Sequence, residues 1–472
     1  MNLLPNSKIY FIGIGGIAMS AAAGIAKQAG FEVTGSDSKA LYDPAKSVLD
    51  ELDIDYFIGY SAEQLKNAQV DVYVASAGED LSNPEIAYLR DKNIEIYSLS
   101  ELLHALAEDQ LRIVVTGTHG KSTTTAMLGQ TLQTIDDSSF MTGAVLAEAK
   151  RNFHYGTGHY FVFEGDEYKA LYDDPTPKFQ QYHPDILLLT NLEFDHPDVF
   201  NSIEEIQDEF RELIDKMPDD GIVVYNADSS DLAKVVHTSN LGQVSFALDN
   251  SADFTVSNIE TLPDKTMFTV NRKDPASAEY STEQYAINAF GRINVYNALG
   301  VISLLRTLGF SHEQVQDGLD RFRGIKRRFE YIGQTNGGTG AKVFDDYAHH
   351  PTAVKETLAT ARLRFPNSKI WAVFEPHTFS RTEAVLADLS KAFESADKVL
   401  LAEIYPAREK KTENSITGQQ VVEAIAKNHT DVQLVANKNE VIEILQKELS
   451  PTDVVIVMAV GSFNTLALDL VK

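Results

Sequence analysis

Three segments of the chain begin in the same way, with a short continuous apolar run that leads through a turn into a helical pattern. They start at Lys8 (KIYFIGIGGIAMSAAAGIAKQAG), at Arg112 (RIVVTGTHGKSTTTAMLGQTL) and near Lys369 (KIWAVFEPHTFSRTEAVLADLSKAF). Other apolar runs, such as GIVVYN at 221–226 and DVVIVMAV at 453–460, are short, rich in β-branched residues and bounded by polar turns. Continuous apolar strands that alternate with amphipathic helices are typical of parallel sheets covered on both faces. The sequence therefore predicts an α/β protein.

The chain has 472 residues, which suits several domains rather than one core. The polar stretch AEDQ at 107–110 precedes the second segment, and GIKRRFE at 324–330 precedes a glycine-rich turn. We expect three domains, at 1–108, 109–325 and 326–472. The alternating pattern from about 250 to 290 is typical of antiparallel strands in an appended sheet.

Composition and charge exclude several classes of protein. A formal net charge of -27 disfavours nucleic acid and anionic membranes as partners. The chain has no cysteine, which excludes disulfides, thiolate metal sites and cysteine nucleophiles. We find neither a membrane-spanning apolar stretch nor a signal-peptide pattern at the N-terminus, so a cytoplasmic location is expected.

The strongest local signal is GTHGKST, which follows the strand pattern RIVVT and opens a helix. Glycines let the backbone approach phosphate oxygens, a helix N-terminus offers free N–H groups, a lysine neutralises phosphate charge and a hydroxyl can ligate Mg²⁺. An ordinary glycine-rich turn is the alternative. The motif predicts a nucleoside triphosphate site made of Gly117, Thr118, His119, Gly120, Lys121, Ser122 and Thr123.

Two groups of polar residues follow predicted parallel strands and are candidates for a metal site. They are Glu164, Asp166 and Glu167 after HYFVF, and Asn191, Asp195 and His196 after DILLLT. The carboxyl ends of parallel strands gather ligands, and carboxylates with a phosphate oxygen suit Mg²⁺. Solvated loop acids are the alternative interpretation.

The N-terminal segment carries a second glycine pattern, GIGGIA, in which Gly13, Gly15 and Ala18 follow a strand and Asp37 ends the next one. The pattern favours a dinucleotide fold, but the same geometry holds any diphosphate, including that of a UDP-sugar. A tight turn without a ligand is the remaining alternative.

The C-terminal third supplies DDYAHHP at 345–351 and EPHTFSRT at 375–382. Arg381 could hold a carboxylate bidentately, and Asp346 could accept from ribose hydroxyls. His349 and His377 could position an amine or a carboxylate, although a single histidine is more often structural. Lys326, Arg327 and Arg328 of GIKRRFE supply cations for anionic ligands, or form a solvated basic turn.

Seven motifs in order resemble those of the Mur ligase family, the ATP-dependent amide-forming enzymes of peptidoglycan precursor synthesis. They are GIGGIAMS with VTGSD, GTHGKST, TNLEFDHPD, GIKRRFE, DDYAHHP, PHTFSRT and IYPAREK. The resemblance covers essentially the whole chain. It implies a Rossmann-like UDP-sugar domain, a central ATPase domain with a parallel sheet, and a Rossmann-like amino-acid domain.

The resemblance also implies roles for individual residues. Lys121 would hold the ATP phosphates, Ser122 with Glu164 would bind one Mg²⁺ and His196 would serve a second. Asn294 and Asn297 would face adenine, and Arg327 with Asp346 would hold phosphate and ribose. The UDP-sugar would contact Gly13, Gly15, Gly16, Ile17, Asp37 and Ser76. The amino acid would contact Tyr347, His349, His377 and Arg381, so that Lys121, His196, His349 and Arg381 form the catalytic set.

The family members most similar to this chain join L-alanine to UDP-N-acetylmuramate through an acyl phosphate, and PHTFSRT and IYPAREK favour that activity. EGDEY and the long connection YKALYDDPTPKFQQYHPD instead resemble the ligase that recycles a murein tripeptide. Ile293 stands where the family usually has histidine. A nicotinamide dehydrogenase and a non-catalytic nucleotide-binding module are the competing classes. We expect small-molecule substrates and a monomer or weak homodimer.

Overall fold

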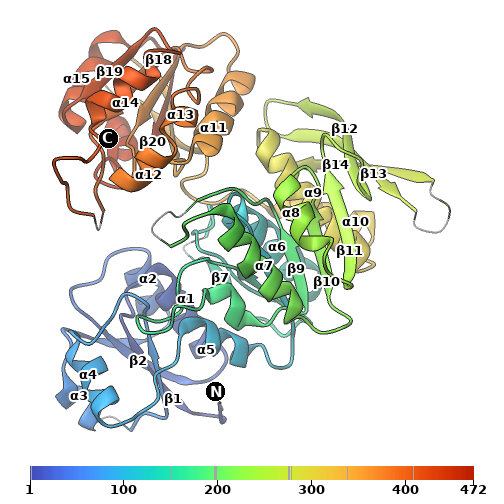
Figure 1. Cartoon of the computed structure of the whole chain (residues 1–472), viewed down its shortest axis with the longest axis vertical. Helices are drawn as coiled ribbons and strands as arrows, with labels where there is room; N and C mark the ends of the chain where they lie inside the picture. The colour runs from blue at the N-terminus through green and yellow to red at the C-terminus, as the bar shows by residue number, and fades with distance from the viewer. Residues whose placement is uncertain are drawn as a thin grey trace.

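The computed structural model describes residues 1, 3–67, 69–149, 151–195, 199–274, 277, 279–336, 339–407 and 409–472. Three sheets follow one another along the chain, and each forms its own lobe in Figure 1, coloured blue, cyan to yellow, and orange to red. The expected α/β class with three sheet-containing domains is confirmed. Among the described residues, no helix is both long and apolar enough to cross a membrane.

The N-terminal sheet has four parallel strands in the order β3-β2-β1-β4. Its strands are β1 (Lys8–Ile12), β2 (Glu32–Asp37), β3 (Asp55–Ile58) and β4 (Val72–Ala75). Its helices are α1 (Ile17–Gln28), α2 (Ala45–Glu51), α3 (Ala62–Asn67), α4 (Pro84–Asp91) and α5 (Leu99–Leu106). Helix α1 is rich in alanine and buried from Met19 to Ala26, because small side chains let it lie close to its neighbours.

The central sheet has ten strands in the order β14-β13-β12-β11-β10-β9-β5-β8-β6-β7. The parallel strands are β5 (Leu111–Thr116), β6 (Ser139–Met141), β8 (Tyr160–Glu164), β9 (Ile186–Leu189), β10 (Ile222–Asn226) and β11 (Gly242–Ala247), with the short β7 (Phe153–His154) antiparallel at one edge. At the other edge β12 (Phe254–Thr261), β13 (Thr266–Lys273) and β14 (Tyr280–Ile287) run antiparallel to one another. The predicted antiparallel strands are therefore present, and they extend the central sheet.

Helices cover the central sheet and carry much of the candidate site. They are α6 (Lys121–Asp136), α7 (Ile203–Asp215), α8 (Ser230–Val236), α9 (Arg292–Thr307) and α10 (His312–Arg321), with a 3-10 helix η1 at Lys178–Tyr182. Helices α6 and α9 pack in one apolar cluster with the middle strands of the sheet. The first turns of both helices are consequently fixed by the same core.

The C-terminal sheet has six strands in the order β15-β16-β20-β17-β18-β19, all parallel except β15. The strands are β15 (Glu330–Gln334), β16 (Lys342–Asp346), β17 (Ile370–Phe374), β18 (Lys398–Ala402), β19 (Val432–Val435) and β20 (Val454–Met458). The helices are α11 (Pro351–Arg364), α12 (Phe379–Ala384), α13 (Leu386–Leu389), α14 (Gly418–Ile425), α15 (Lys438–Glu448) and α16 (Leu466–Val471).

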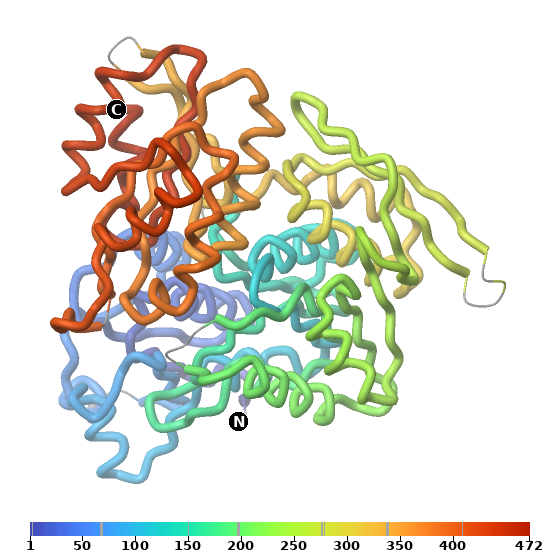
Figure 2. The backbone as a smooth tube through the Cα atoms, turned by 45° about the horizontal axis from the view of Figure 1, so that its top comes forward, coloured from blue at the N-terminus to red at the C-terminus, as the bar shows by residue number. Residues whose placement is uncertain are grey.

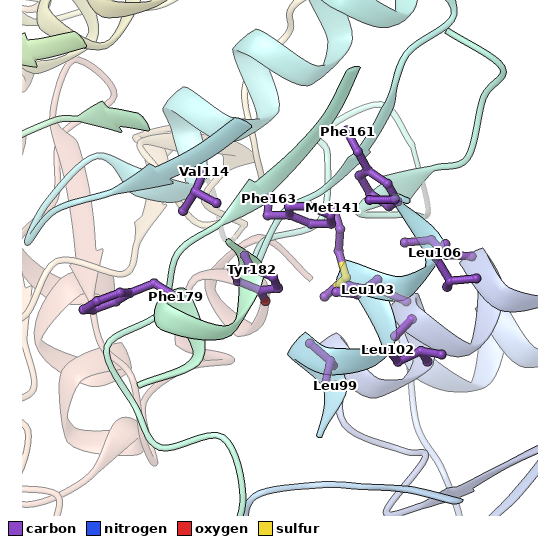
Figure 3. Packing of buried hydrophobic residues seen from close by; sticks show 14 of the residues in the cluster. Leu99, Leu102, Leu103, Leu106, Val114, Met141, Phe161, Phe163, Phe179 and Tyr182 are labelled. Atoms are coloured by element: carbon purple, nitrogen blue, oxygen red, sulfur yellow. The ribbon is translucent and has the colours of Figure 1, made fainter. Parts of the chain in front are cut away.

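The N-terminal and central sheets share an apolar core, whereas the C-terminal sheet does not. Figure 3 shows four leucines of α5 facing Met141, Phe161, Phe163 and Tyr182 of the central domain. The apolar clusters of the C-terminal sheet contain, among the described residues, only side chains from Phe329 onwards. Since each buried leucine contributes roughly 1.5–3 kcal/mol, the first two lobes are joined far more strongly than either is to the third. Figure 2 shows the C-terminal lobe, orange to red, in front of the N-terminal lobe and beside the central one.

Candidate nucleotide and amino-acid site

The loop between β5 and α6 is shaped by glycines that no other residue could replace without strain. Gly117 has φ +132°, and an added Cβ would lie 2.3 Å from Thr190 Oγ1. Gly120 has φ +84°, and its Cβ would lie 2.4 Å from Asn297 Oδ1. Positive φ is the region that glycine alone enters cheaply. No side chain caps the first turn of α6, so its N–H groups stay available for an anion.

Asn191, which follows the neighbouring strand β9, holds this loop through hydrogen bonds to its backbone. Its Oδ1 accepts from the His119 backbone N–H at 2.8 Å, and its Nδ2 donates to the His119 carbonyl at 2.9 Å. Thr190 Oγ1 donates to the same carbonyl at 2.7 Å. The loop is therefore preorganised without a ligand, and Asn191 serves the loop's backbone rather than a metal in this arrangement.

The Lys121 ammonium is buried and already paired. Nζ lies 2.8 Å from Glu167 Oε1 and donates to the Gly117 carbonyl at 2.6 Å. Burial would lower the pKa of Lys121, but Glu167 and the nearby acids raise it overall, so the lysine stays charged. Burial raises the pKa of Glu167 to about 7, against the opposing effect of Lys121. A phosphate oxygen entering the loop would compete with Glu167 for the same ammonium.

Ser122 and Glu164, the residues expected at a metal, do come together. Ser122 Oγ donates to Glu164 Oε1 at 2.7 Å, and Thr142 Oγ1 donates to Glu164 Oε2 at 3.0 Å. A hydroxyl and a carboxylate are the hard oxygen ligands that Mg²⁺ prefers, so the residues present fit that ion. Asp166 is also near the Lys121 charge, but its ion pair is with Lys178 at 2.9 Å. His196, expected near a second Mg²⁺, lies outside the described residues.

A cavity of about 350 Å³ opens beside the loop, between the ends of β9 and β10 and the first turns of α9. Asn297 and Ile293 line it. Asn294 does not line it and instead accepts a hydrogen bond from Asn297 Nδ2 at 3.3 Å. Asn297 thus lines the cavity and is hydrogen-bonded to Asn294, and the contacts expected between both asparagines and adenine stay predictions.

Arg327 and Asp346 occupy one corner of the C-terminal domain, where each has internal partners. Arg327 Nε lies 3.2 Å from Asp345 Oδ2, and its guanidinium lies 5.2 Å from the Tyr347 ring centroid. Asp346 is buried, accepting from the Phe329 and Ala348 backbone N–H groups at 2.8 and 2.7 Å. The contacts expected between these two residues and phosphate or ribose stay predictions.

The residues expected to bind the amino acid gather at the ends of β16 and β17. The rings of Tyr347 and His349 lie 5.5 Å apart, and those of His349 and His377 lie 5.8 Å apart. Arg381 Nη1 is 3.5 Å from His377 Nδ1. Burial, followed by the charge of Arg381, lowers the pKa of His349 well below its usual value, so that ring is neutral. His377 also faces the Tyr405 ring at 5.9 Å.

The glycine turn of the N-terminal sheet is held by Asp37. Gly15 N–H donates to Asp37 Oδ2 at 2.9 Å, and an added Cβ on Gly15 would meet that oxygen at 2.7 Å. Gly16 and Ile17 begin α1, and Ser76 follows β4 with its Cβ beside Gly13. All six residues expected at a UDP-sugar therefore lie along the carboxyl edge of this sheet, where open α/β sheets bind ligands.

Three family descriptions match the chain in the order of its sheets. Residues 8–111 match the Mur ligase family catalytic domain, 115–305 the Mur ligase middle domain, and 327–461 the Mur ligase glutamate ligase domain. Together they span most of the sequence.

The chain belongs to the Mur ligase family.

Relatives of this Mur ligase match it over nearly its whole length. The UDP-N-acetylmuramate–L-alanine ligase of Clostridium acetobutylicum is 34% identical over 97% of this chain and 95% of its own. The ligase of the same name from Desulfitobacterium hafniense is 34% identical over 98% and 99%. Mur ligases form amide bonds at the expense of ATP, and this chain is accordingly an ATP-dependent ligase.

Solved structures agree in fold. MurC of Thermotoga maritima, a UDP-N-acetylmuramate–alanine ligase, has a TM-score of 0.78 at 25% identity, with 98% of each chain covered. A murein peptide ligase of Psychrobacter arcticus has a TM-score of 0.70 at 27% identity, also with 98% of each chain covered. MurF of Thermotoga maritima, solved with ADP, has a TM-score of 0.62 at 18% identity, covering 93% of this chain and 94% of its own, and shows the fold alone.

Glu193 joins the nucleotide loop of this Mur ligase to its C-terminal domain, a role that our sequence analysis missed. Its Oε2 accepts from His119 Nε2 at 3.3 Å and from Thr352 Oγ1 at 2.9 Å. Burial would raise the pKa of Glu193, but His119, Thr352 and His350 together lower it to about 2. The carboxylate is consequently charged and shared between domains.

A second contact between the central and C-terminal domains is the ion pair of Asp195 and Arg381, in which Oδ1 and Nη2 are 2.9 Å apart. Both side chains are less than a tenth exposed, so the pair is shielded from solvent. Asp195, expected near a metal, thus contacts the arginine expected to bind the amino acid.

Asp228 and Tyr296 are further cavity residues that sequence reasoning missed. Tyr296 OH donates to Asp228 Oδ2 at 2.7 Å, and both line the cavity. Asp228 follows the carboxyl end of β10, and the strand-end rule that found the other acids could have found it. Tyr296 carries no such signal, because an aromatic residue in a buried helix is usually core.

Proposed function

We propose that this Mur ligase joins L-alanine to the carboxylate of UDP-N-acetylmuramate with ATP, through an acyl phosphate, in the cytoplasmic synthesis of peptidoglycan precursors. Residues 1–108 would bind the UDP-sugar, 109–325 ATP, and 326–472 the amino acid, in a monomer or weak homodimer. The observation that carries the proposal is the Asp195–Arg381 pair, which brings the expected amino-acid pocket against the domain of the nucleotide loop. The near full-length similarity to ligases of this name supports the choice of substrates.

The nucleotide loop supplies charge and position for phosphoryl transfer. A carboxylate resists amine attack because it is anionic and lacks a leaving group, and phosphorylation removes both obstacles. The Lys121 ammonium and the free N–H groups of α6 would neutralise the phosphates. Ser122, Glu164 and His196 would hold Mg²⁺, which when bound supplies Lewis-acid stabilisation of phosphate charge.

The side chains of Tyr347, His349, His377 and Arg381 in the C-terminal domain would position the amine. Since the Tyr347 carbonyl can only accept, His349 Nδ1 carries the proton in their 2.9 Å hydrogen bond. His349 Nε2 then has a lone pair with which to accept from the amino group, while Arg381 binds the carboxylate. Water would hydrolyse an acyl phosphate, so the C-terminal domain would have to close before transfer.

A tripeptide-recycling ligase is the second candidate, favoured in sequence by the long connection after Glu167. This connection packs on the N-terminal domain: Asp173 pairs with Arg90 at 2.8 Å, and Gln181 accepts from Ser98 Oγ at 2.5 Å. It is thus engaged with the sugar domain rather than with the pocket for the amine. Its length alone does not argue for a larger amine.

A coupled assay of ADP release tests the substrate assignment. With UDP-N-acetylmuramate and ATP present, L-alanine should stimulate ADP release more than other amino acids or the murein tripeptide. Turnover with the tripeptide alone would transfer the assignment to the recycling ligase.

The role of Lys121 is tested by Lys121→Ala, which should lower turnover by at least about a hundredfold because a preorganised phosphate donor is lost. Binding of UDP-N-acetylmuramate should be unchanged. Lys398→Ala is the control, since Lys398 is also a mostly buried lysine with a carboxylate partner, Glu448 at 2.8 Å, but belongs to no proposed site. Unchanged turnover in Lys121→Ala would refute the assigned role.

A further inference from the structure

Three side chains that can ligate a metal converge where the nucleotide loop meets the C-terminal domain. His119 lies in the loop after β5, Glu193 follows β9, and His350 immediately precedes α11. One ligand atom from each lies within 4.8 Å of the others. The two imidazole rings are 4.6 Å apart between centroids. We call these three residues the interdomain cluster.

The nitrogen of His350 that faces the cluster has no hydrogen-bond partner. His350 is 7% exposed, and its Nδ1 is buried without a hydrogen bond to any described residue. The nearest carboxylate atom, Glu193 Oε2, is 3.8 Å away, which is beyond hydrogen-bond range. A buried polar atom without a partner is costly and rare in folded proteins. A cation bound between the three side chains would give this nitrogen the partner that it lacks.

The spacing of the cluster suits a tetrahedral ion once the His350 side chain moves inward. In a zinc site with bonds of about 2.0–2.1 Å, neighbouring ligand atoms lie roughly 3.3 Å apart. His119 Nε2 and Glu193 Oε2 are already 3.3 Å apart. His350 Nδ1 is 3.8 Å from Glu193 Oε2, and the ligand atoms of the two histidines lie within 4.8 Å of each other, so His350 must move inward towards both partners to reach that spacing. Thr352 Oγ1 donates to Glu193 Oε2 and would orient the carboxylate, as partners of metal ligands commonly do.

We infer that His119, Glu193 and His350 form a binding site for a borderline-soft divalent cation of the Zn²⁺ class. Two imidazoles and one carboxylate favour such an ion, whereas Mg²⁺ prefers oxygen ligands in an octahedron. The site shares no residue with the proposed Mg²⁺ ligands Ser122, Glu164 and His196. His119 also belongs to the predicted ATP loop, and His119 and Glu193 line the cavity beside it, but the inference of a cation site does not rest on the ligase reaction.

Occupation of this site would link two domains. His119 and Glu193 belong to the central domain and His350 to the C-terminal domain, which lacks a shared apolar core with the rest of the described chain. A bound ion would fasten the N-terminus of α11 to the nucleotide loop. Zinc-class ions would thereby restrict the opening of the C-terminal domain.

The test measures metal binding by the full chain after removal of metals with a chelator. In excess Mg²⁺, Zn²⁺ should be taken from a chromophoric chelator, and Co²⁺ should give the intense visible absorption of a tetrahedral site. His350→Gln and Glu193→Gln should each weaken Zn²⁺ binding at least tenfold and abolish the Co²⁺ band. His154→Gln is the matched control, because His154 also pairs with a carboxylate, Asp137, at 2.8 Å but lies outside the cluster.

Glu164→Gln distinguishes the interdomain cluster from the proposed Mg²⁺ site. This variant should still bind one Zn²⁺ ion as tightly as the unaltered chain does. Zinc anomalous scattering from a soaked crystal of the unaltered chain provides a measurement that needs no variant, and should peak between the three side chains. Absence of tight Zn²⁺ binding, equal binding by His350→Gln, or an anomalous peak elsewhere would overturn the inference.

Discussion

At the scale of single residues, the positive charge expected to bind phosphate, that of Lys121, already has a carboxylate partner within the protein. The ammonium of Lys121 rests against Glu167, and Ser122 against Glu164. These contacts satisfy groups that would be costly to bury alone. A nucleotide must therefore exchange partners on entering, and the protonation of Glu167 decides how readily Lys121 is released.

The affinity for ADP should depend on the charge of Glu167. Its pKa is about 7, so the carboxylate becomes charged as pH rises from 6 to 8 and then competes with phosphate for Lys121. A phosphate nearby would raise that pKa further, so binding favours the protonated form. Relative to Glu167→Gln, the unaltered chain should lose roughly tenfold in ADP affinity over this range.

Calorimetric titration of ADP without divalent cations measures this difference. Ionisation of the nucleotide itself affects both proteins equally and cancels in the comparison. An identical pH dependence in the unaltered chain and in Glu167→Gln would contradict the assignment.

At the scale of elements, the site depends on how α6 begins. The helix starts at Lys121 directly after Gly120, whose left-handed backbone turns the chain from β5 into the helix. Helix α9 brings Asn297 against that same glycine. The loop, α6 and α9 therefore form one unit. A change in the backbone angle of Gly120 should consequently shift Asn297, which lines the cavity.

Gly120→Ala should lower ADP affinity at least tenfold. A left-handed alanine costs about 1–2 kcal/mol, and its Cβ would also displace Asn297 Oδ1 from 2.4 Å. Gly309→Ala is a matched control, since Gly309 has φ +92° with no atom near the added Cβ. Both variants should melt at a lowered temperature, because both place alanine in the left-handed region, but only Gly120→Ala should bind ADP more weakly. Equal ADP affinity in the two would show that the contact with Asn297 is unimportant.

At the scale of the whole molecule, two interfaces of different character divide the chain. The N-terminal and central domains share apolar core, as the leucines of α5 show, whereas the C-terminal domain is joined by polar contacts such as Asp195 with Arg381. Polar contacts can be exchanged for ligand contacts at little net cost, but an apolar core cannot be opened without exposing it to water. We accordingly expect the C-terminal domain to be the one that moves relative to the other two.

Arg381→Ala should loosen the C-terminal domain and increase the radius of gyration in small-angle X-ray scattering. Removing one partner of a buried pair costs about 3–5 kcal/mol, because Asp195 would remain charged and enclosed. Arg151→Ala is the control: Arg151 pairs with Glu51 at 2.7 Å across the other interface, where apolar packing should hold the domains. An unchanged radius in Arg381→Ala would mean that other contacts fix the C-terminal domain.

The sequence by itself determined the α/β class, three sheet-containing domains and the membership of the Mur ligase family. It could do so because strands, turns and phosphate loops depend on residues that are neighbours in the chain, such as Gly117 to Ser122. It also singled out Tyr347, His349, His377 and Arg381, which the structure brings together at the ends of two strands of one parallel sheet. Its assignments of ligands to these residues remain predictions.

Only the tertiary structure decided which side chains meet across domains. Glu193 and His350 are 157 positions apart, a difference of their residue numbers, and no local pattern links them. Asp166 and Asp195 were candidates for the metal site in sequence, as Glu164 was. In the structure Asp166 forms an ion pair with Lys178, and Asp195 forms one with Arg381. The partner of a charged group depends on which domains lie against each other, and this depends on the summed packing of whole lobes rather than on any short segment.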